Sequence, residues 1–406
     1  MGKRNATRIT AADIAKAGEG GLPKLVKDLI SKAKHGDSEA REGAACMLKS
    51  LSEQNHYEHT KLLFKQGAIP PLVDVLATGS AKAQGAACSA LFAICTSKPE
   101  HQAAMMEAGV AAPLVRLTKG GSAKVQEEAA STIASIEADV THQRELIKAG
   151  CIPPLVNMLR GGSAAAQAFA AQALGNAAAF HAEHGQNAIV RAGAIPLLIR
   201  LLSENKAQAR AASALAKLAT KNGSVQDAIA ASGGIAPLLS LLNGRDTNAQ
   251  VQAAFALSEL AQDNATTQAA IAKAGGIGPL LAMLSSRSGA AQANAMGALA
   301  QLARGNAENQ DAIAKMGGVK PLVQLLDEMK GSSEPNVQVR VGDPVRTRAR
   351  ARTARQADAN PSAHARTARQ ADANPSAHTR TARQADSQAK RTRRTSRQES
   401  MAWHSS

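Results

Sequence analysis

The stretch Gln268–Met283, QAAIAKAGGIGPLLAM, decides the fold, because most of the chain repeats its pattern. A short helix-like run ends in Ala-Gly, a tight turn follows, and a second run opens on Ile and Pro-Leu-Leu. Equivalent glycines lie at Gly20, Gly67, Gly109, Gly150, Gly193, Gly233, Gly275 and Gly317, separated by 47, 42, 41, 43, 40, 42 and 42 residues. A period near 42 residues predicts an array of helical repeats, each stacked on its neighbours.

Each unit reads as three helices. The first closes at the turn glycine, which suits a left-handed backbone, and the second carries proline in its first turn, as at Pro153 and Pro154. The third is the longest and is rich in alanine, as in residues 164–179. A glutamine recurs seven residues before the turn glycine, at Gln102, Gln143, Gln186, Gln226, Gln268 and Gln310. Because one unit cannot bury its Leu/Ile stripe alone, stacking is expected to create one continuous core, with the third helices lining one face of a curved rod.

The composition agrees with an all-α fold. Hydrophobic residues make up 44 % of the 406 residues but aromatic residues only 2 %, so alanine and leucine must fill the core. The four cysteines, Cys46, Cys88, Cys95 and Cys151, form no CxxC pair and lie in apolar helical runs, as expected of buried thiols in a reducing compartment. We therefore predict an intracellular protein of the cytoplasm, the nucleus or both.

Membrane attachment is not expected. No apolar stretch approaches the roughly 18 residues that a membrane span needs, and the N-terminus MGKRNATRIT lacks the apolar core of a signal peptide. A myristoyl anchor on Gly2 would require Ser or Thr at the position that Ala6 occupies. We predict neither a transmembrane segment nor a lipid anchor.

The C-terminal region differs from the repeats. Residues 342–406 hold 14 Lys/Arg and 5 Asp/Glu, and ARTARQADANPSAH at 351–364 recurs unchanged at 365–378 as a 14-residue tandem repeat. Such a composition cannot bury enough apolar area to offset the entropy of ordering, so a disordered tail is predicted. Its basic motif, Lys390, Arg391, Arg393 and Arg394, resembles a nuclear-localisation signal or a contact for RNA or anionic membranes, and Ser396 resembles a site for a basophilic kinase. An inert solvated tail is the alternative.

No pattern in the sequence indicates catalysis. No nucleophile has a plausible base, and the Gly-Gly-Ser loops lack the Lys-Ser/Thr ending of a phosphate-binding loop. Glu127 and Glu128 are adjacent in sequence, so we do not expect them to face one pocket together. We predict that the protein is not an enzyme and that it uses no cofactor or metal.

The phrase GxIxPLLxLL, followed by a loop and xxQxxAAxALxxLA, resembles the armadillo repeat over about residues 10–341. The repeat sequence is similar to that of plant- and algal-type armadillo arrays, including those of U-box ubiquitin ligases and vacuolar scaffold proteins. The resemblance implies a right-handed α-α superhelix of about eight repeats, whose concave groove holds extended peptides or partner proteins. The predicted division is an extension at 1–9, a solenoid at 10–341 with an incomplete last repeat, and the tail at 342–406. The incomplete end should leave Leu322, Val323, Leu325 and Leu326 partly uncovered.

Importin-α, a member of this family, offers a test of function. Its third helices present a Trp and, four residues on, an Asn that grips the backbone of a basic peptide. At the matching positions here only Asn176 retains the Asn, and Phe255 is the one aromatic residue. The long basic ladder of β-catenin is also absent, with Lys217 largely alone. The resemblance therefore argues against a nuclear transport-type adaptor for basic cargo, which remains the alternative function.

These considerations predict a non-catalytic scaffold that binds a partner protein or an extended peptide. The candidate groove residues should lie on adjacent inner helices and mix one apolar anchor with amides that can pair with a peptide backbone. They are Gln172, Asn176, Lys217, Phe255, Glu259 and Gln301. The alternative is that Phe255 belongs to the core and that the others form a solvated face.

Overall fold

The computed structural model describes residues 11–54, 56–96, 98–136, 139–180, 184–204 and 207–331. All of them belong to one compact unit, residues 1–344. Within these ranges the chain forms 22 helices and no strand, so the predicted all-α class is confirmed. The extension at 1–9 and the tail at 342–406, with its basic motif and Ser396, lie outside the described residues, and their predicted roles stay predictions.

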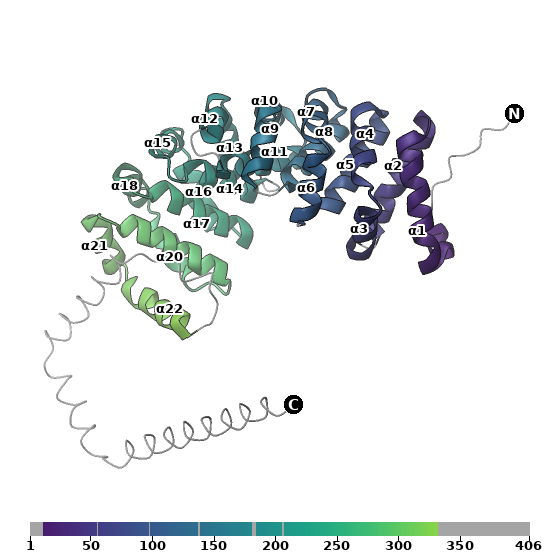
Figure 1. Ribbon diagram of the computed structural model, residues 1–406. Helices are drawn as coiled ribbons and strands as arrows, with labels where there is room; N and C mark the ends of the chain where they lie inside the picture. The colour runs from purple at the N-terminus through teal and green to yellow at the C-terminus, as the bar shows by residue number, and fades with distance from the viewer. Residues whose placement is uncertain are drawn as a thin grey trace, which may run out of the picture. The chain divides into compact units, whose positions relative to one another are not determined.

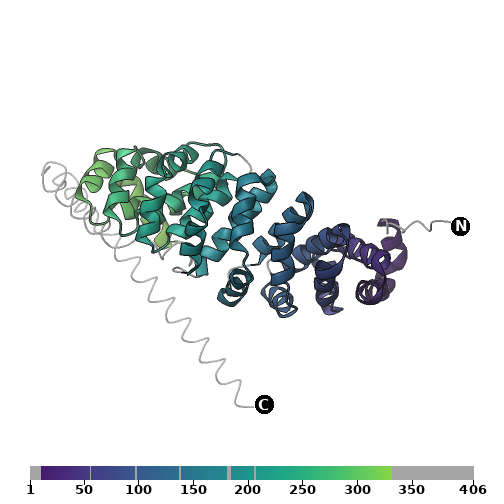
Figure 2. The same ribbon diagram turned by 90° about the horizontal axis from the view of Figure 1, so that it is seen from above.

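Six units, between α3 and α20, have the predicted three helices and follow one another in chain order (Figure 1, Figure 2). The first helices are α3 (His56–Lys65), α6 (Pro99–Glu107), α9 (Val140–Lys148), α12 (His184–Arg191), α15 (Gly223–Ala231) and α18 (Ala265–Lys273). The second helices are α4 (Ile69–Thr78), α7 (Ala111–Gly120), α10 (Ile152–Gly161), α13 (Ala194–Leu201), α16 (Ile235–Leu242) and α19 (Ile277–Met283). The third helices are α5 (Ala81–Cys95), α8 (Ala123–Ser135), α11 (Ala164–Phe180), α14 (Gln208–Ala219), α17 (Thr247–Ala261) and α20 (Gly289–Ala303).

The first unit departs from this pattern. A single helix, α1 (Ala11–His35), runs through Gly20 and Pro23, and α2 (Ser38–Gln54) takes the place of a third helix. The turn predicted at Gly20 was therefore wrong. Later first helices, such as α6, α12 and α15, pack on the third helix of the preceding unit, whereas α1 continues as one helix that packs on α2 and α4.

The last unit contains α21 (Ala307–Lys315) and α22 (Val319–Gly331), and its third helix would fall beyond the described residues. Leu322 is buried, whereas Val323, Leu325 and Leu326 stay partly exposed. Three of the four apolar residues predicted to be partly uncovered are therefore so.

The turn glycines behave as the repeat pattern predicts at seven of the eight positions. Gly67, Gly109, Gly150, Gly193, Gly233, Gly275 and Gly317 have φ between +74° and +83°. A side chain is strained in this left-handed region, so glycine ends each first helix and turns the chain into the second. The second helices then bury their leucines, such as Leu72, Leu155 and Leu238, at zero exposure.

The third helices pack side by side, each on the next, from α2 through α5, α8, α11, α14 and α17 to α20. Small residues permit this close approach. A Cβ added at Gly175 on α11 would lie 3.1 Å from Cα of Ala214 on α14. The alanine-rich composition of the third helices is therefore a consequence of how closely they stack.

A ladder of buried amides joins consecutive units. Gln226 of α15 donates from Nε2 to the carbonyl oxygen of Ala219 at the end of α14, at 3.2 Å. The same nitrogen lies 2.9 Å from the carbonyl oxygen of Glu259 and 3.2 Å from that of Gln262, at the end of α17. Gln102 likewise bridges the ends of α5 and α8. The equivalent residues Gln143, Gln186, Gln268 and Gln310 also donate to carbonyls at the ends of third helices. The last carbonyls of a helix have no partner within it, so these amides satisfy them.

Within the described ranges no single helix is long and apolar enough to cross a membrane. The α15–α16 pair passes that test only jointly, by length and composition, and is bent by 82° at its break.

Removal of one ladder amide should weaken the array. Gln226→Ala removes the side-chain amide whose two hydrogens serve three carbonyls at the ends of α14 and α17, so we expect the free energy of unfolding to fall by about 2 kcal/mol. Urea unfolding followed by circular dichroism measures this change. The control Gln208→Ala removes an amide that makes no side-chain hydrogen bond in the described chain, and it should change the free energy by less than about 0.5 kcal/mol. Equal effects of the two substitutions would contradict a structural role for the ladder.

The buried cysteines provide a second test. Burial raises the pKa of the Cys95 and Cys151 thiols to about 12 and that of Cys88 further. Since the thiolate is the reactive form, alkylation by iodoacetamide at pH 8 should modify these three only after urea unfolding, and half-buried Cys46 first. Mass spectrometry of the labelled protein gives the order, and rapid labelling of Cys88 in the folded protein would contradict it.

Because the folded pKa values of Cys95 and Cys151 lie above the unfolded value, the stability that these thiols contribute is complete below pH 9 and is lost as the pH rises towards 12.

Candidate functional site

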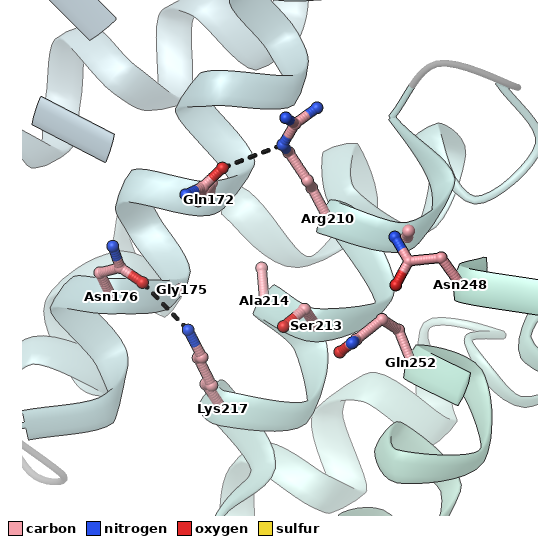
Figure 3. A pocket seen from close by; sticks show the side chains of 10 residues that line it. Gln172, Gly175, Asn176, Arg210, Ser213, Ala214, Lys217, Asn248 and Gln252 are labelled. Atoms are coloured by element: carbon pink, nitrogen blue, oxygen red, sulfur yellow. Dashed lines mark hydrogen bonds between the residues drawn. The ribbon is translucent and has the colours of Figure 1, made fainter. Parts of the chain in front are cut away.

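A cavity of about 200 Å³ opens over the third helices α11, α14 and α17. We call it the central cavity. Figure 3 shows its polar lining, which comprises Gln172 and Asn176 from α11, Arg210, Ser213 and Lys217 from α14, and Asn248 and Gln252 from α17. Gly175 and Ala214 lie between these side chains, and their small size leaves room above the α11–α14 contact.

Asn176 is buried, and both polar atoms of its side-chain amide form hydrogen bonds. Its Nδ2 donates to the carbonyl oxygens of Ala134 at 3.1 Å and Ile136 at 3.4 Å, at the end of α8. Its Oδ1 accepts from Nζ of Lys217 at 3.0 Å. Asn176 thus caps α8, and a peptide that uses its Oδ1 has to displace the ammonium group of Lys217.

Gln172 has a similar arrangement one turn earlier. Its Nε2 donates to the carbonyl oxygen of Ala134 at 3.2 Å, and its Oε1 accepts from Nε of Arg210 at 2.9 Å. The Arg210 guanidinium also lies over the ring of Phe169, 5.3 Å from its centroid. Two neutral amides of α11 therefore hold the two cations of α14 (Figure 3).

Lys217 is the most perturbed group in the cavity. Burial lowers the pKa of its ammonium group, because the charge loses solvation. Its partner is the neutral amide of Asn176, and no carboxylate of the described chain lies within ion-pair distance. The cavity therefore holds a positive charge that the described protein does not neutralise.

The six predicted groove residues occupy four adjacent third helices, but only Gln172, Asn176 and Lys217 come together at the central cavity. Phe255 is partly exposed on α17, and Glu259 is buried at 5 % exposure on the same helix. Gln301 lies on α20, and its buried Oε1 has no hydrogen-bond partner among the described residues. A binding role for any of the six stays a prediction.

Sequence reasoning missed Arg210, Asn248 and Gln252 as groove residues. The signal for Arg210 was its spacing, because it precedes Lys217 by seven residues, or two helical turns, and shares its side of α14. Asn248 and Gln252 reach the cavity only because α17 packs beside α14.

A second cavity, of about 410 Å³, lies over α2, α5, α8 and α11 and includes Phe92, Phe169, Glu127 and Glu128 in its lining. The expectation that Glu127 and Glu128 would not share a pocket was wrong. Both side chains reach Nζ of Lys124, at 3.3 Å and 2.9 Å, because Lys124 lies three and four residues before them on α8. Hydrogen bonding from Ser163, followed by that from Lys124, lowers the pKa of Glu127.

The comparisons with known proteins agree with this geometry. The family model of the armadillo/beta-catenin-like repeat matches residues 56–96 and 141–179. The chain is 31 % identical to an engineered protein of the Northeast Structural Genomics Consortium, with a TM-score of 0.68, over 81 % of this chain and 78 % of that one. It is 28 % identical to the designed armadillo repeat protein YIII(Dq)4CqI, with a TM-score of 0.54, over 58 % of this chain and 99 % of the other. The chain belongs to the armadillo-repeat family.

The armadillo array has further relatives. The model of the SIL1/FES1/HPBP1 C-terminal domain matches residues 225–373. A designed armadillo repeat protein in complex with peptide (KR)4 is 26 % identical, with a TM-score of 0.53, over 58 % of this chain and 99 % of that chain. No curated protein matches. The predicted family and fold are confirmed, and the fold is that of a protein- and peptide-binding scaffold.

Among the described residues no group of three or more His, Cys, Asp or Glu could hold a metal ion. The armadillo fold is typical of binding scaffolds rather than enzymes, and the prediction that the protein is not an enzyme stays a prediction.

The lowered pKa of Lys217 predicts a pH-dependent stability. Between its folded pKa and the usual value of 10.5, only the unfolded chain binds the proton, so the stability of the wild-type protein rises with pH in that window. Lys217→Met lacks this contribution, and its stability relative to wild type should fall as the pH rises towards 10.5. Urea unfolding between pH 7.5 and 10.5 measures the difference.

Lys273→Met, which removes an exposed ammonium group from α18, is the control. Its stability relative to wild type should stay constant over the same pH range. A constant difference for Lys217→Met as well would contradict the desolvation of Lys217.

Proposed function

We propose that the protein is a non-catalytic adaptor whose third-helix face binds a partner protein or an extended peptide, centred on the central cavity. The observation that carries the proposal is the polar, open cavity over α11, α14 and α17, on helices whose backs are fixed in the core. Amides, a hydroxyl and two cations at this surface offer the hydrogen-bonding groups that an extended backbone requires.

The comparisons support this function at the level of the fold. A designed armadillo repeat protein similar to this chain was solved in complex with the peptide (KR)4. Adaptation to basic peptides is not favoured here. Arg210 and Lys217 would repel a basic side chain that enters the central cavity, so we infer that the ligand differs from that of a transport adaptor for basic cargo.

The cellular compartment is also a proposal. Cys88, Cys95 and Cys151 are buried free thiols, and Cys46 is half-buried and free. Free thiols suit a reducing environment, which supports the cytoplasm or the nucleus.

A substitution that fills the cavity tests the function. Ser213→Tyr puts a large side chain on the partly exposed floor of the central cavity, and it should weaken binding of a groove ligand about tenfold or more. The ligand is obtained by selecting 12-residue peptides from a random display library on the full chain, and fluorescence anisotropy gives the Kd.

Ser240→Tyr is the matched control, because Ser240 is exposed on the second helix α16 and does not line the cavity. Unchanged binding to Ser213→Tyr, or equal loss with both variants, would contradict groove binding. The peptide (KR)4 should bind the wild-type protein and both variants more weakly than the selected peptides bind the wild-type protein.

A further inference from the structure

The cations on the inner helices differ in how they are neutralised. Lys82 pairs with Glu42 at 2.9 Å, and Lys124 pairs with Glu128 at 2.9 Å. Arg210 and Lys217 have no carboxylate partner within the described chain and contact only neutral groups. The lysines of the inner face near α5 and α8 are thus paired with carboxylates, whereas the two cations at the centre are not.

The other polar side chains of the central cavity also make few interactions with the described protein. Among the residues that the structure describes, none that lines it is acidic. Ser213 and Gln252, which are partly exposed, and Asn248, which is exposed, make no side-chain hydrogen bond in the part of the chain that the structure describes. The cavity therefore combines two cations without a counter-ion and three polar side chains that are free to donate.

We propose that the central cavity binds an anionic side chain of the extended peptide, a carboxylate or a phosphoryl group, between Arg210 and Lys217. The inference rests on the proposed function, because it specifies the ligand of the same groove. It adds the sign of the charge, the two residues that recognise it and the helix on which they lie.

The geometry of α14 suits this role. Arg210 and Lys217 are seven residues apart, which separates their backbones by roughly 10 Å along the helix, and Ser213 lies between them above the packed Gly175–Ala214 contact. Both side chains are long enough to turn towards a group over Ser213. A cavity of about 200 Å³ holds the head of one such side chain rather than a folded segment.

An anion is a better hydrogen-bond acceptor for Arg210 and Lys217 than the amide oxygens that they contact in the structure. Arg210 and Lys217 now donate to the amide oxygens of Gln172 and Asn176. A charged acceptor forms a stronger hydrogen bond than a neutral amide, and the partial burial of Lys217 strengthens its attraction to an opposite charge. The two released amide oxygens would then be available to accept backbone N–H groups of the peptide, so recognition of charge and of backbone would be coupled.

The test starts from the peptides selected on the full chain. Those that lose binding with Ser213→Tyr are resynthesised with glutamate, phosphoserine, glutamine or lysine at each acidic position. We expect glutamate→glutamine at one position to weaken binding to the wild-type protein about tenfold, and lysine to weaken it further. A tighter phosphoserine peptide identifies a phosphoryl group as the preferred anion, and a weaker one identifies a carboxylate.

Protein variants then locate the contact. In Arg210→Gln or Lys217→Met the glutamate and glutamine peptides should differ by less than about twofold, which is the coupling expected of a direct pair. The controls Arg144→Gln and Lys273→Met remove exposed cations from the first helices α9 and α18 and should preserve the tenfold preference. Because Arg210 is exposed, Arg210→Gln keeps the test valid even if Lys217→Met alters the fold.

Two outcomes overturn the inference in distinguishable ways. Peptides that need the open cavity but bind equally with glutamate and glutamine exclude an anion site and leave the proposed function standing. If no selected peptide loses affinity in the Ser213→Tyr variant, both the anion site and the proposed groove function are overturned. Competition by inorganic phosphate alone, without any preference among the peptides, would also overturn the inference, because the site would then recognise a free ion.

Discussion

The carboxyl end of every third helix has carbonyl groups that the helix itself cannot satisfy, and the array depends on how neighbouring units meet that need. Gln226 reaches the ends of both α14 and α17, and Gln102 those of α5 and α8. These amides are buried, so they hold the units in register at positions where water cannot substitute. The leucines and alanines supply most of the burial, but hydrophobic contact is not directional. The buried hydrogen bonds fix which carbonyl faces which amide.

The candidate site also satisfies carbonyls at the end of a third helix with side-chain amides, in this case from the next third helix. Gln172 and Asn176 of α11 both donate to the end of α8, through the carbonyl of Ala134. Because their nitrogens are committed to this structural role, their oxygens point to α14 and accept from Arg210 and Lys217. The amides that join units therefore also set the positions of the cations.

This coupling provides the physical basis for the ligand selectivity that we propose for the inner face. Over α5 and α8 the cations Lys82 and Lys124 are paired with carboxylates, so that region offers an anionic ligand no cation without a partner. At the centre, within the described part of the chain, Arg210 and Lys217 contact the amides of Gln172 and Asn176 and the ring of Phe169. A ligand that carries an anion can improve on those neutral partners, whereas a basic ligand cannot. The designed relative bound to (KR)4 shares the fold, and local charge accounts for the different ligand that we propose here.

The sequence by itself determined the repeat and its unit. Three local features recur in the sequence and can be recognised in it. They are a glycine with positive φ near every 42nd residue, prolines in the first turn of second helices, and alanine-rich third helices. The resemblance to importin-α also pointed to Gln172, Asn176 and Lys217, which occupy the third-helix positions that match its Trp and Asn residues. Tertiary structure decided the rest. The α1 helix continues through Gly20 and packs on α2 and α4, and Glu127 and Glu128 both contact Lys124 and line one cavity. The partners of Asn176 lie about one repeat away on either side, at Ala134 and Lys217. Hydrogen bonds between units depend on how closely the helices stack, and that distance is set by packing across the whole array rather than by any one stretch of chain.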